Sequence, residues 1–135
     1  MSKIAGGCLC GNVRYSAPGE PVLTAICHCK DCQKQTGTSF SVIIGMPSLT
    51  LSVKGTLKTF VHTGDGDKPV HRNFCLDCGS PITSNTDARP GLSFIKAGTL
   101  DDASWLEPTV EIWCGSAQPW VSLVSDRQKF AKAPG

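Results

Sequence analysis

The stretch "AICHCKDCQKQTG", residues 25–37, places three cysteines within six positions: Cys27, Cys29 and Cys32. Zinc binds thiolate readily in tetrahedral sites, and two cysteines on a tight turn can both face one ion. Four more cysteines form two pairs far from this stretch: Cys8 with Cys10, and Cys75 with Cys78. So many closely spaced cysteines in 135 residues predict a fold that is built around bound zinc.

The length and composition favour a single reduced domain. A chain of 135 residues usually forms one core, so we expect residues 1–135 to be a single domain. The first residues, "MSKIAGGCLCGN", lack the apolar run of a signal peptide, and we expect a cytoplasmic protein whose thiols stay reduced. This expectation disfavours the alternative of a secreted disulfide scaffold. No apolar run approaches the roughly 18–20 residues that span a bilayer, so we expect no membrane partner.

The rest of the chain predicts short strands separated by turn residues. Apolar and polar residues alternate in residues 12–17, and the other predicted strands are 39–45, 49–53, 57–62, 70–74, 92–98 and 109–114. Residues 49–62 have the pattern of a hairpin with Gly55 in its turn. The one predicted helix is short, in residues 29–37, and ends at Gly37. About seven strands with turns between them predict an all-β fold, an antiparallel sandwich or barrel.

Spacing alone leaves two ways to share the cysteines between zinc ions. A regular zinc ribbon would join Cys29 and Cys32 to the pair Cys75/Cys78, and would leave Cys8 and Cys10 over. The other arrangement joins the two distant pairs in one closed four-thiolate site, and the triplet then holds a second ion with one position open. Three protein ligands with an open position are typical of a catalytic zinc site. The second arrangement explains the crowded triplet better, because each of its cysteines then has a role.

Three motifs, "GGCLCGNVRY", "CHCKDCQKQTGTSFS" and "FCLDCGSPIT", resemble in order and spacing those of the glutathione-dependent formaldehyde-activating enzyme family, which includes centromere protein V. The segment "SAQPW" is similar to the one that closes the domain in that family. The resemblance runs from about residue 3 to about residue 122, and it implies an antiparallel β-sandwich or β-tent-like fold with two zinc ions. It also implies ligand sets: Cys8, Cys10, Cys75 and Cys78 match the structural ligands, and Cys27, Cys29 and Cys32 match the catalytic ones.

The resemblance implies a carbon–sulfur lyase that forms or cleaves a thiol–aldehyde adduct, such as S-hydroxymethylglutathione from glutathione and formaldehyde. An open zinc site can hold the glutathione sulfur deprotonated, or it can polarise the aldehyde oxygen. Four thiolates around one zinc ion carry a net negative charge, which nearby Lys30, Lys34 or Arg72 could offset. The chain is shorter than the enzyme that named the family, so the glutathione-contacting surface does not carry over.

Several residues near the triplet have a functional and a structural interpretation. His28 could be a base or a substitute ligand, but alternation in an extended chain favours a side chain that faces away from the metal. Cys114 lies outside the family motif and is interpreted as an inert, buried thiol. We expect the remaining candidates to serve helix ends, strands or the core rather than chemistry: Gln33, Thr36, Gly37, Thr38, His62, His71, Trp105, Trp113 and Trp120.

Two other function classes compete with the enzyme. A non-catalytic zinc-stabilised β module that binds a partner would use the same cysteines, but a purely structural ion would take a fourth protein ligand. Nucleic-acid binding through a zinc ribbon is disfavoured, because no run of Lys and Arg forms a basic patch. We therefore expect a small-molecule thiol, glutathione first, and an aldehyde as partners, with no nucleic acid.

Overall fold

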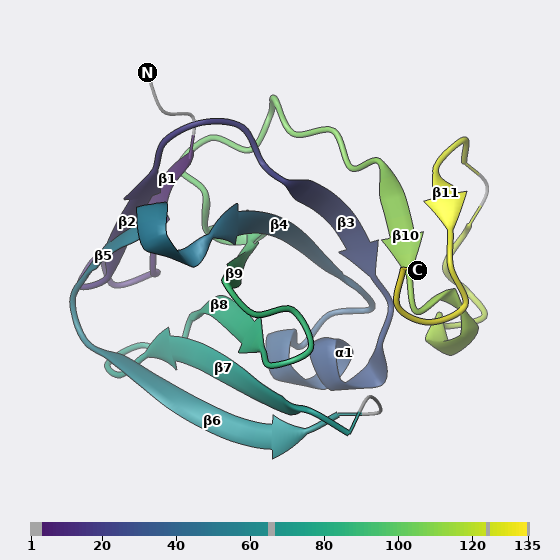
Figure 1. Ribbon diagram of the computed structural model, residues 1–135, viewed down its shortest axis with the longest axis horizontal. Helices are drawn as coiled ribbons and strands as arrows, with labels where there is room; N and C mark the ends of the chain where they lie inside the picture. The colour runs from purple at the N-terminus through teal and green to yellow at the C-terminus, as the bar shows by residue number, and fades with distance from the viewer. Residues whose placement is uncertain (1–3, 65–66, 124, 135) are drawn as a thin grey trace.

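A computed structural model describes residues 4–64, 67–123 and 125–134 of the chain (Figure 1). These residues form eleven strands, one α-helix and three short 3-10 helices. The strands are β1 Ile4–Gly7, β2 Arg14–Ala17, β3 Leu23–Cys27, β4 Ser41–Pro47, β5 Ser52–Lys54, β6 Leu57–Thr63, β7 Pro69–Cys75, β8 Pro81–Thr86, β9 Leu92–Lys96, β10 Val110–Ile112 and β11 Gln128–Lys129. The helices are α1 Lys30–Thr36, η1 Ser48–Thr50, η2 Ala97–Thr99 and η3 Cys114–Ser116. The predicted all-β class with one short helix is confirmed.

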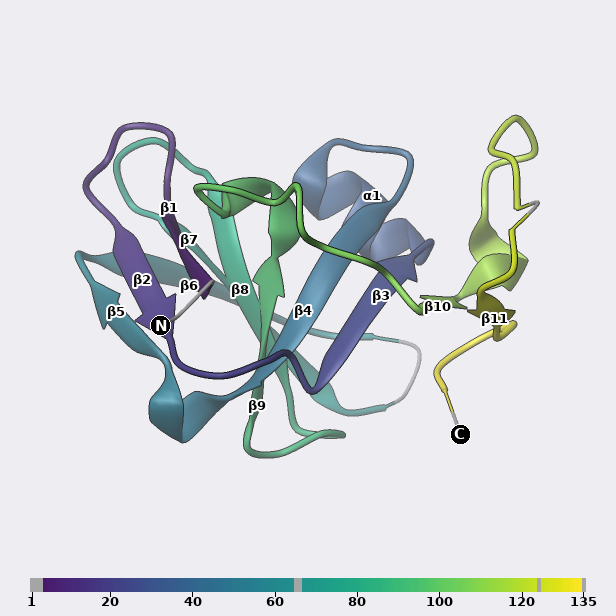
Figure 2. The same cartoon turned by 90° about the horizontal axis from the view of Figure 1, so that it is seen from above.

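The strands make two sheets. The smaller sheet has the order β1-β2-β5, and the larger one runs β11-β10-β3-β4-β9-β8-β7-β6. All neighbouring pairs from β3 to β6 are antiparallel as predicted, whereas β10 lies parallel to both β3 and β11. Figures 1 and 2 place the small sheet at one end of the molecule and β10 and β11 at the other.

The central strands of the large sheet bury side chains on both faces. Successive side chains of a strand point to opposite faces, so Ile43 and Ile44 of β4 enter different clusters. Ile44 and Ile95 pack with small-sheet residues such as Tyr15 in a core that both sheets supply. Ile43 and Phe94 pack on the opposite face, in a cluster that contains Cys27 and Cys32 of the triplet. The second face is therefore the one that carries the triplet.

Helix α1 begins and ends where the sequence predicts. The Cys29 sulfur caps its first turn by accepting a hydrogen bond from the Cys32 backbone N–H. Gly37 ends it in the left-handed region, at φ 70°, which glycine adopts without strain. In the described part of the chain, no helix combines the length and apolar character of a membrane span.

The predicted hairpin over residues 49–62 is wrong. Strand β5 pairs with β2 of the small sheet, and β6 pairs with β7 of the large one. Gly55 does lie in a turn, at φ 101°, but a side chain there would collide with the Asn12 carbonyl oxygen. This turn carries the chain from one sheet to the other instead of folding it back. The predicted strand over 49–53 is also only partly formed, because Ser48–Thr50 are η1 and only Ser52–Lys54 are β5. Its alternation did not indicate a buried face, since Leu49 and Val53 are exposed, and alternation does not specify the partner strand.

Candidate metal centres and the adjoining pocket

The structure brings the two distant cysteine pairs together. All four sulfurs of Cys8, Cys10, Cys75 and Cys78 lie within 4.8 Å of one another. The Cys10 sulfur is 3.5 Å from that of Cys8 and 3.8 Å from that of Cys75, 65 positions away. We call these four residues the four-cysteine set.

Hydrogen bonds hold the two segments of the four-cysteine set in register. Asn12 Nδ2 donates to Asp77 Oδ2 across the two segments at 2.9 Å, and the Leu9 backbone N–H donates to Ser80 Oγ. Ser80 also lies beside the sulfur of Cys78, at 3.2 Å. Hydrogen bonds from the Ser80 hydroxyl and backbone lower the pKa of Cys78 to about 5, which favours the thiolate.

The triplet forms a separate cluster. Cys27 ends β3, Cys29 caps α1 and Cys32 lies in the first turn of α1, so one strand-to-helix junction supplies all three sulfurs. Their sulfurs lie within 4.8 Å of one another, and that of Cys27 is 3.8 Å from that of Cys32. The structure therefore does not form the zinc-ribbon arrangement, which would join Cys29 and Cys32 to the pair Cys75/Cys78.

Both clusters fit a tetrahedral metal ion. With zinc–sulfur bonds of about 2.3 Å, neighbouring sulfurs of a tetrahedral site lie about 3.8 Å apart. The sulfur separations of 3.5–3.8 Å match this edge, whereas a disulfide would require about 2.05 Å. Each cluster could therefore hold a metal ion, with four protein sulfurs in the first and three in the second.

Two cations face the triplet. Arg72 of β7 donates from Nη1 to the Cys32 sulfur at 3.5 Å, and its Nε donates to His62 at 2.9 Å. Contacts with the neighbouring Cys27 and Cys29 thiols, followed by the charges of Lys96 and Arg72, hold the pKa of Cys32 far below its ordinary value, although burial opposes this. Contacts with the Cys29 and Cys32 thiols, followed by burial, raise the pKa of Cys27. The positive charges of Lys96 and Arg72 therefore favour the thiolate form at the triplet.

Of the three cations proposed from the sequence, Arg72 lies at the triplet, while Lys30 and Lys34 are exposed. Lys96 was missed. It is 5% exposed at the end of β9, a strand whose last four residues are all buried. The sequence does carry a signal for Lys96, which is its position within the apolar run "LSFIKAG". Lysine is rarely buried without a partner, so a lysine in a buried strand indicates a site with negative charge or hydrogen-bond acceptors.

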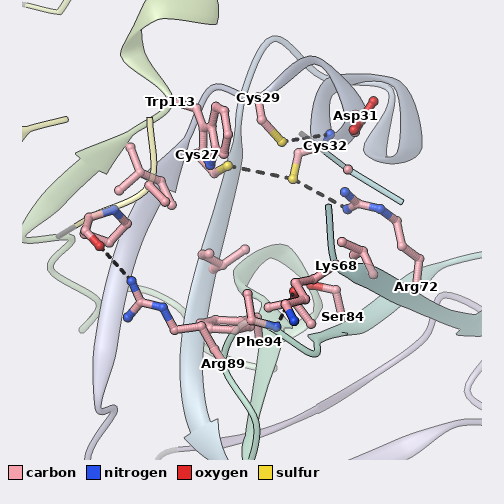
Figure 3. Close-up of a pocket in the computed structure, with 18 of the residues that line it drawn as sticks. Cys27, Cys29, Asp31, Cys32, Lys68, Arg72, Ser84, Arg89, Phe94 and Trp113 are labelled. Carbon is pink, nitrogen blue, oxygen red and sulfur yellow. Dashed lines mark hydrogen bonds between the residues drawn. The ribbon is translucent and has the colours of Figure 1, made fainter. Parts of the chain in front are cut away.

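The triplet opens into a pocket of about 240 Å³. Figure 3 shows Cys27, Cys29 and Cys32 at one end of it, with Lys68, Ser84, Arg89 and Phe94 at the other. The apolar part of the wall is formed by side chains of β3, β4, β7, β9 and β10 and by Trp113: Leu23, Ile43, Val70, Phe94, Ile112 and Trp113. Four cations also line it: Lys68, Arg72, Arg89 and Lys96. The pocket therefore suits a small ligand that carries negative charge and a group able to meet sulfur or metal.

His28 does not join the triplet. Its ring is 1% exposed, and Nε2 lies 2.9 Å from Glu111 Oε1, as the prediction that it faces away requires. The other oxygen of Glu111 accepts from Ser125 Oγ at 2.9 Å and from Arg127 Nε at 3.1 Å. Although burial opposes its charge, the hydrogen bonds from His28, Ser125 and Arg127 hold the pKa of Glu111 below its ordinary value. Sequence reasoning missed Glu111, whose partners lie up to 83 positions away.

The side chain of Gln33 holds the backbone next to the triplet through hydrogen bonds. Its side-chain amide donates to the carbonyl oxygen of His28 at 2.7 Å and to that of Ser116, and it accepts from Gln118 at 2.7 Å. Together with the His28–Glu111 pair, these bonds fix the backbone between Cys27 and Cys32.

The other candidates have structural surroundings, with one exception. The Thr36 hydroxyl donates to the Cys32 carbonyl oxygen and is bonded to Thr38 within the helix end. The expectation that Trp120 packs in the core is wrong, because its side chain is 72% exposed. Trp113 is the exception, because it lines the pocket. Cys114 is only half-buried, beside His28 and Glu111, and burial followed by the Glu111 charge raises its pKa.

Glu111→Ala is expected to lower the free energy of unfolding by about 1–3 kcal/mol, because buried His28 and half-buried Arg127 lose their hydrogen-bond acceptor. Urea unfolding of the metal-loaded protein at pH 7 measures this. Asp101→Ala is the matched control, since it breaks the Arg14–Asp101 ion pair, whose side chains are 50% and 53% exposed. That exposed pair is expected to contribute less than about 1 kcal/mol. Equal losses in the two variants would contradict a supporting role for Glu111.

The family model and the curated relatives that match this chain carry the same family description. A family model described as glutathione-dependent formaldehyde-activating enzyme matches residues 3–116. A Phaeosphaeria nodorum protein that provisionally carries this enzyme name is 30% identical over 113 residues, 78% of this chain and 59% of its own length. A similarly named Aspergillus terreus protein is 32% identical over 85 residues, 61% of this chain and 44% of its own. The chain thus spans about half the length of these curated relatives.

A solved structure supports the fold. The crystal structure of a Rhodobacter sphaeroides protein superposes with a TM-score of 0.58 and covers 78% of this chain and 92% of that one. The two sequences are 20% identical, so the likeness concerns the fold alone.

Proposed function

This chain belongs to the glutathione-dependent formaldehyde-activating enzyme family, and on that premise we propose that it is a zinc-dependent carbon–sulfur lyase. It forms or cleaves a thiol–aldehyde adduct, with S-hydroxymethylglutathione, made from glutathione and formaldehyde, as the first candidate. The observation that carries the proposal is a three-sulfur cluster that opens into a charged pocket.

The two clusters take different roles. We assign Cys8, Cys10, Cys75 and Cys78 to a structural zinc ion, because four protein sulfurs close the coordination sphere. We assign Cys27, Cys29 and Cys32 to a catalytic zinc ion with one position left for substrate. Zinc held there would keep a substrate thiol deprotonated, since a free thiol has a pKa near 8.5, and could polarise an aldehyde oxygen.

The residues of the pocket bind and orient the substrate. Arg72 and Lys96 offset the negative charge that a fourth sulfur adds to the triplet. Lys68 and Arg89 lie at the opposite end, where they suit the carboxylates of glutathione (Figure 3). The apolar side chains, among them Ile43 and Phe94, exclude water from the space between, which strengthens each charge interaction.

We also infer that the protein is cytoplasmic and that it acts as a single domain. Reduced thiols are required for both clusters, and a cytoplasmic location keeps them so. Residues 1–135 act as one domain in this proposal. The first strand, β1, leads into Cys8 and Cys10, and the last strand, β11, pairs with β10, which in turn pairs with β3, the strand that ends in Cys27.

The experiment is a glutathione titration followed by a rate measurement. Calorimetry of the zinc-loaded protein with millimolar glutathione is expected to show binding, and NMR is expected to show adduct formation from formaldehyde faster than the uncatalysed rate. Absence of both, with metal retained at both clusters, would reject the enzyme. It would favour a non-catalytic module that binds a partner, which could contact exposed apolar side chains such as Leu9 and Leu76, 90% and 55% exposed beside the four-cysteine set.

Arg72→Gln is expected to weaken metal retention at the triplet by about tenfold or more, because groups that hydrogen-bond to ligands commonly affect affinity to that extent. Competition with a chromophoric chelator measures the affinity of the weaker ion. Lys34→Gln is the control: Lys34 is a cation of helix α1 that is exposed. If both variants release metal equally, the contact between Arg72 and Cys32 has no role in holding the ion.

A further inference from the structure

The four cations of the pocket differ in exposure and in what they bind. Lys68 and Arg89 are exposed, and Arg89 Nη2 donates to the Pro134 carbonyl oxygen at 2.8 Å. Arg72 is engaged with Cys32 and His62. Lys96 is as buried as Arg72, each 5% exposed, but it is not engaged with a cysteine: Nζ donates to Ser41 Oγ at 3.3 Å, its one acceptor in the described part of the chain.

We propose that Lys96 binds the aldehyde oxygen of the substrate and stabilises the negative charge that develops on it during adduct formation. The inference rests on the proposed function and adds to it a catalytic residue and the atom that this residue contacts. An ammonium group has three N–H donors, so at least two of Lys96 are open to a ligand in the pocket.

The chemistry needs such a donor. The thiolate sulfur attacks the carbonyl carbon, a carbon–sulfur bond forms, and the carbonyl π pair moves onto oxygen. The alkoxide accepts a hydrogen bond from Lys96 Nζ and then takes from water the proton that the thiol released on binding. In the reverse direction the hydroxyl loses this proton, the π bond re-forms and the thiolate leaves.

The surroundings make this donor effective. Ile43, Phe94 and Ile112 line the same pocket, and a donor that is already in place within apolar walls acts more strongly than one in water. Lys96 lines the same pocket as all three cysteines of the triplet. A small aldehyde that enters this space would thus meet the attacking sulfur and Lys96 together.

The first test is kinetic. Lys96→Met is expected to lower kcat for adduct formation by about 100-fold, the usual effect of removing one oxyanion donor. This loss is expected to exceed any change in metal content or in the KM for glutathione that follows from losing a positive charge near the triplet. Lys96→Gln keeps a neutral donor and is expected to lose less. Lys68→Met, which removes an exposed cation from the same pocket, is expected to raise the KM for glutathione more than it lowers kcat. Lys34→Met, at an exposed cation of α1 that does not line this pocket, is expected to leave both unchanged. A Lys96→Met enzyme with wild-type kcat, or one whose loss follows its loss of metal, would overturn the proposal.

The second test does not depend on activity. Formate has one carbon and a charged oxygen, so it imitates the alkoxide. Its binding can be followed by NMR in protein from which mild chelation has removed only the ion of the triplet, so that the four-cysteine set stays loaded and the domain stays folded. We expect Lys96→Met to weaken formate binding by about tenfold or more, the effect of losing a charged hydrogen bond, while Lys68→Met has less effect. If the wild type forms no adduct but formate binding still requires Lys96, the proposed reaction fails and the oxyanion site stands. If Lys96→Met binds formate as the wild type does, the site itself is refuted.

Discussion

Cys75→Ser is expected to abolish folding, the largest effect of any single substitution considered for this chain. Cys75 is fully buried at the end of β7, and its sulfur lies 3.8 Å from that of Cys10. Binding free energy at a structural zinc ion is also folding free energy, about 10 kcal/mol or more in small peptides. The whole free energy of unfolding of a domain is about 5–15 kcal/mol. Losing one ligand of the closed site can therefore remove most of the stability.

Circular dichroism and thermal unfolding of purified protein measure this effect. The variant is expected to be insoluble, or to lack the β-sheet signal and a cooperative transition. Cys114→Ser is the matched control, because Cys114 belongs to neither cysteine cluster, and it is expected to stay folded. A soluble Cys75→Ser protein with wild-type thermal stability would show that the four-cysteine set does not hold the fold together.

Cys29→Ser is expected to give a folded protein that has lost about one equivalent of metal and all adduct-forming activity. Three donors from one short segment hold an ion less firmly than four donors from two distant segments, and a catalytic ion contributes less to folding than a closed one. Serine also caps helices well, so it can replace the Cys29 sulfur as acceptor for the Cys32 N–H. The variant therefore removes a ligand and keeps the cap.

Metal analysis, circular dichroism and the adduct assay test this variant together. Mild chelation of the wild type, before any thiol is added, should reproduce it: one ion leaves while the β-sheet signal remains. Loss of both ions together with that signal would contradict the division into a structural and a catalytic site. Retention of two ions by Cys29→Ser would mean that another residue, His28 or Cys114 first, is a ligand.

The cysteine pattern and the alternation of residues predicted most of what positions the site. The two distant cysteine pairs, once joined, connect β1 to the end of β7, and the alternation of Val13, Tyr15 and Ala17 matches their burial. The helix over Lys30–Thr36 follows from its glycine end. These features depend on neighbours in sequence or on metal chemistry, both of which a single sequence displays.

Strand pairing was harder to predict. Residues 49–62 contain two strands and a glycine turn, yet β5 and β6 pair with different sheets, because partner choice depends on the packing of segments far away. Strand β3 was not predicted at all, although it ends in Cys27, because a short apolar run does not distinguish a buried strand from other buried segments.

The charged residues around the triplet were found in part. Arg72 was one of three candidates, and only the register of β7 brings it to Cys32. Lys96 and Glu111 were missed because their partners, Ser41 and His28, lie 55 and 83 positions away. Such pairs depend on the tertiary fold, which composition and periodicity do not determine.

The central claim is that one cluster holds a closed structural zinc ion and the other an open catalytic one. The most direct measurement is an anomalous difference map at the zinc absorption edge, from crystals grown with and without glutathione. We predict two peaks per chain, one among Cys8, Cys10, Cys75 and Cys78 and one among Cys27, Cys29 and Cys32, and a glutathione sulfur at the second peak alone. A single peak, a ligand set that mixes the two clusters, or glutathione bound away from the triplet would contradict the account.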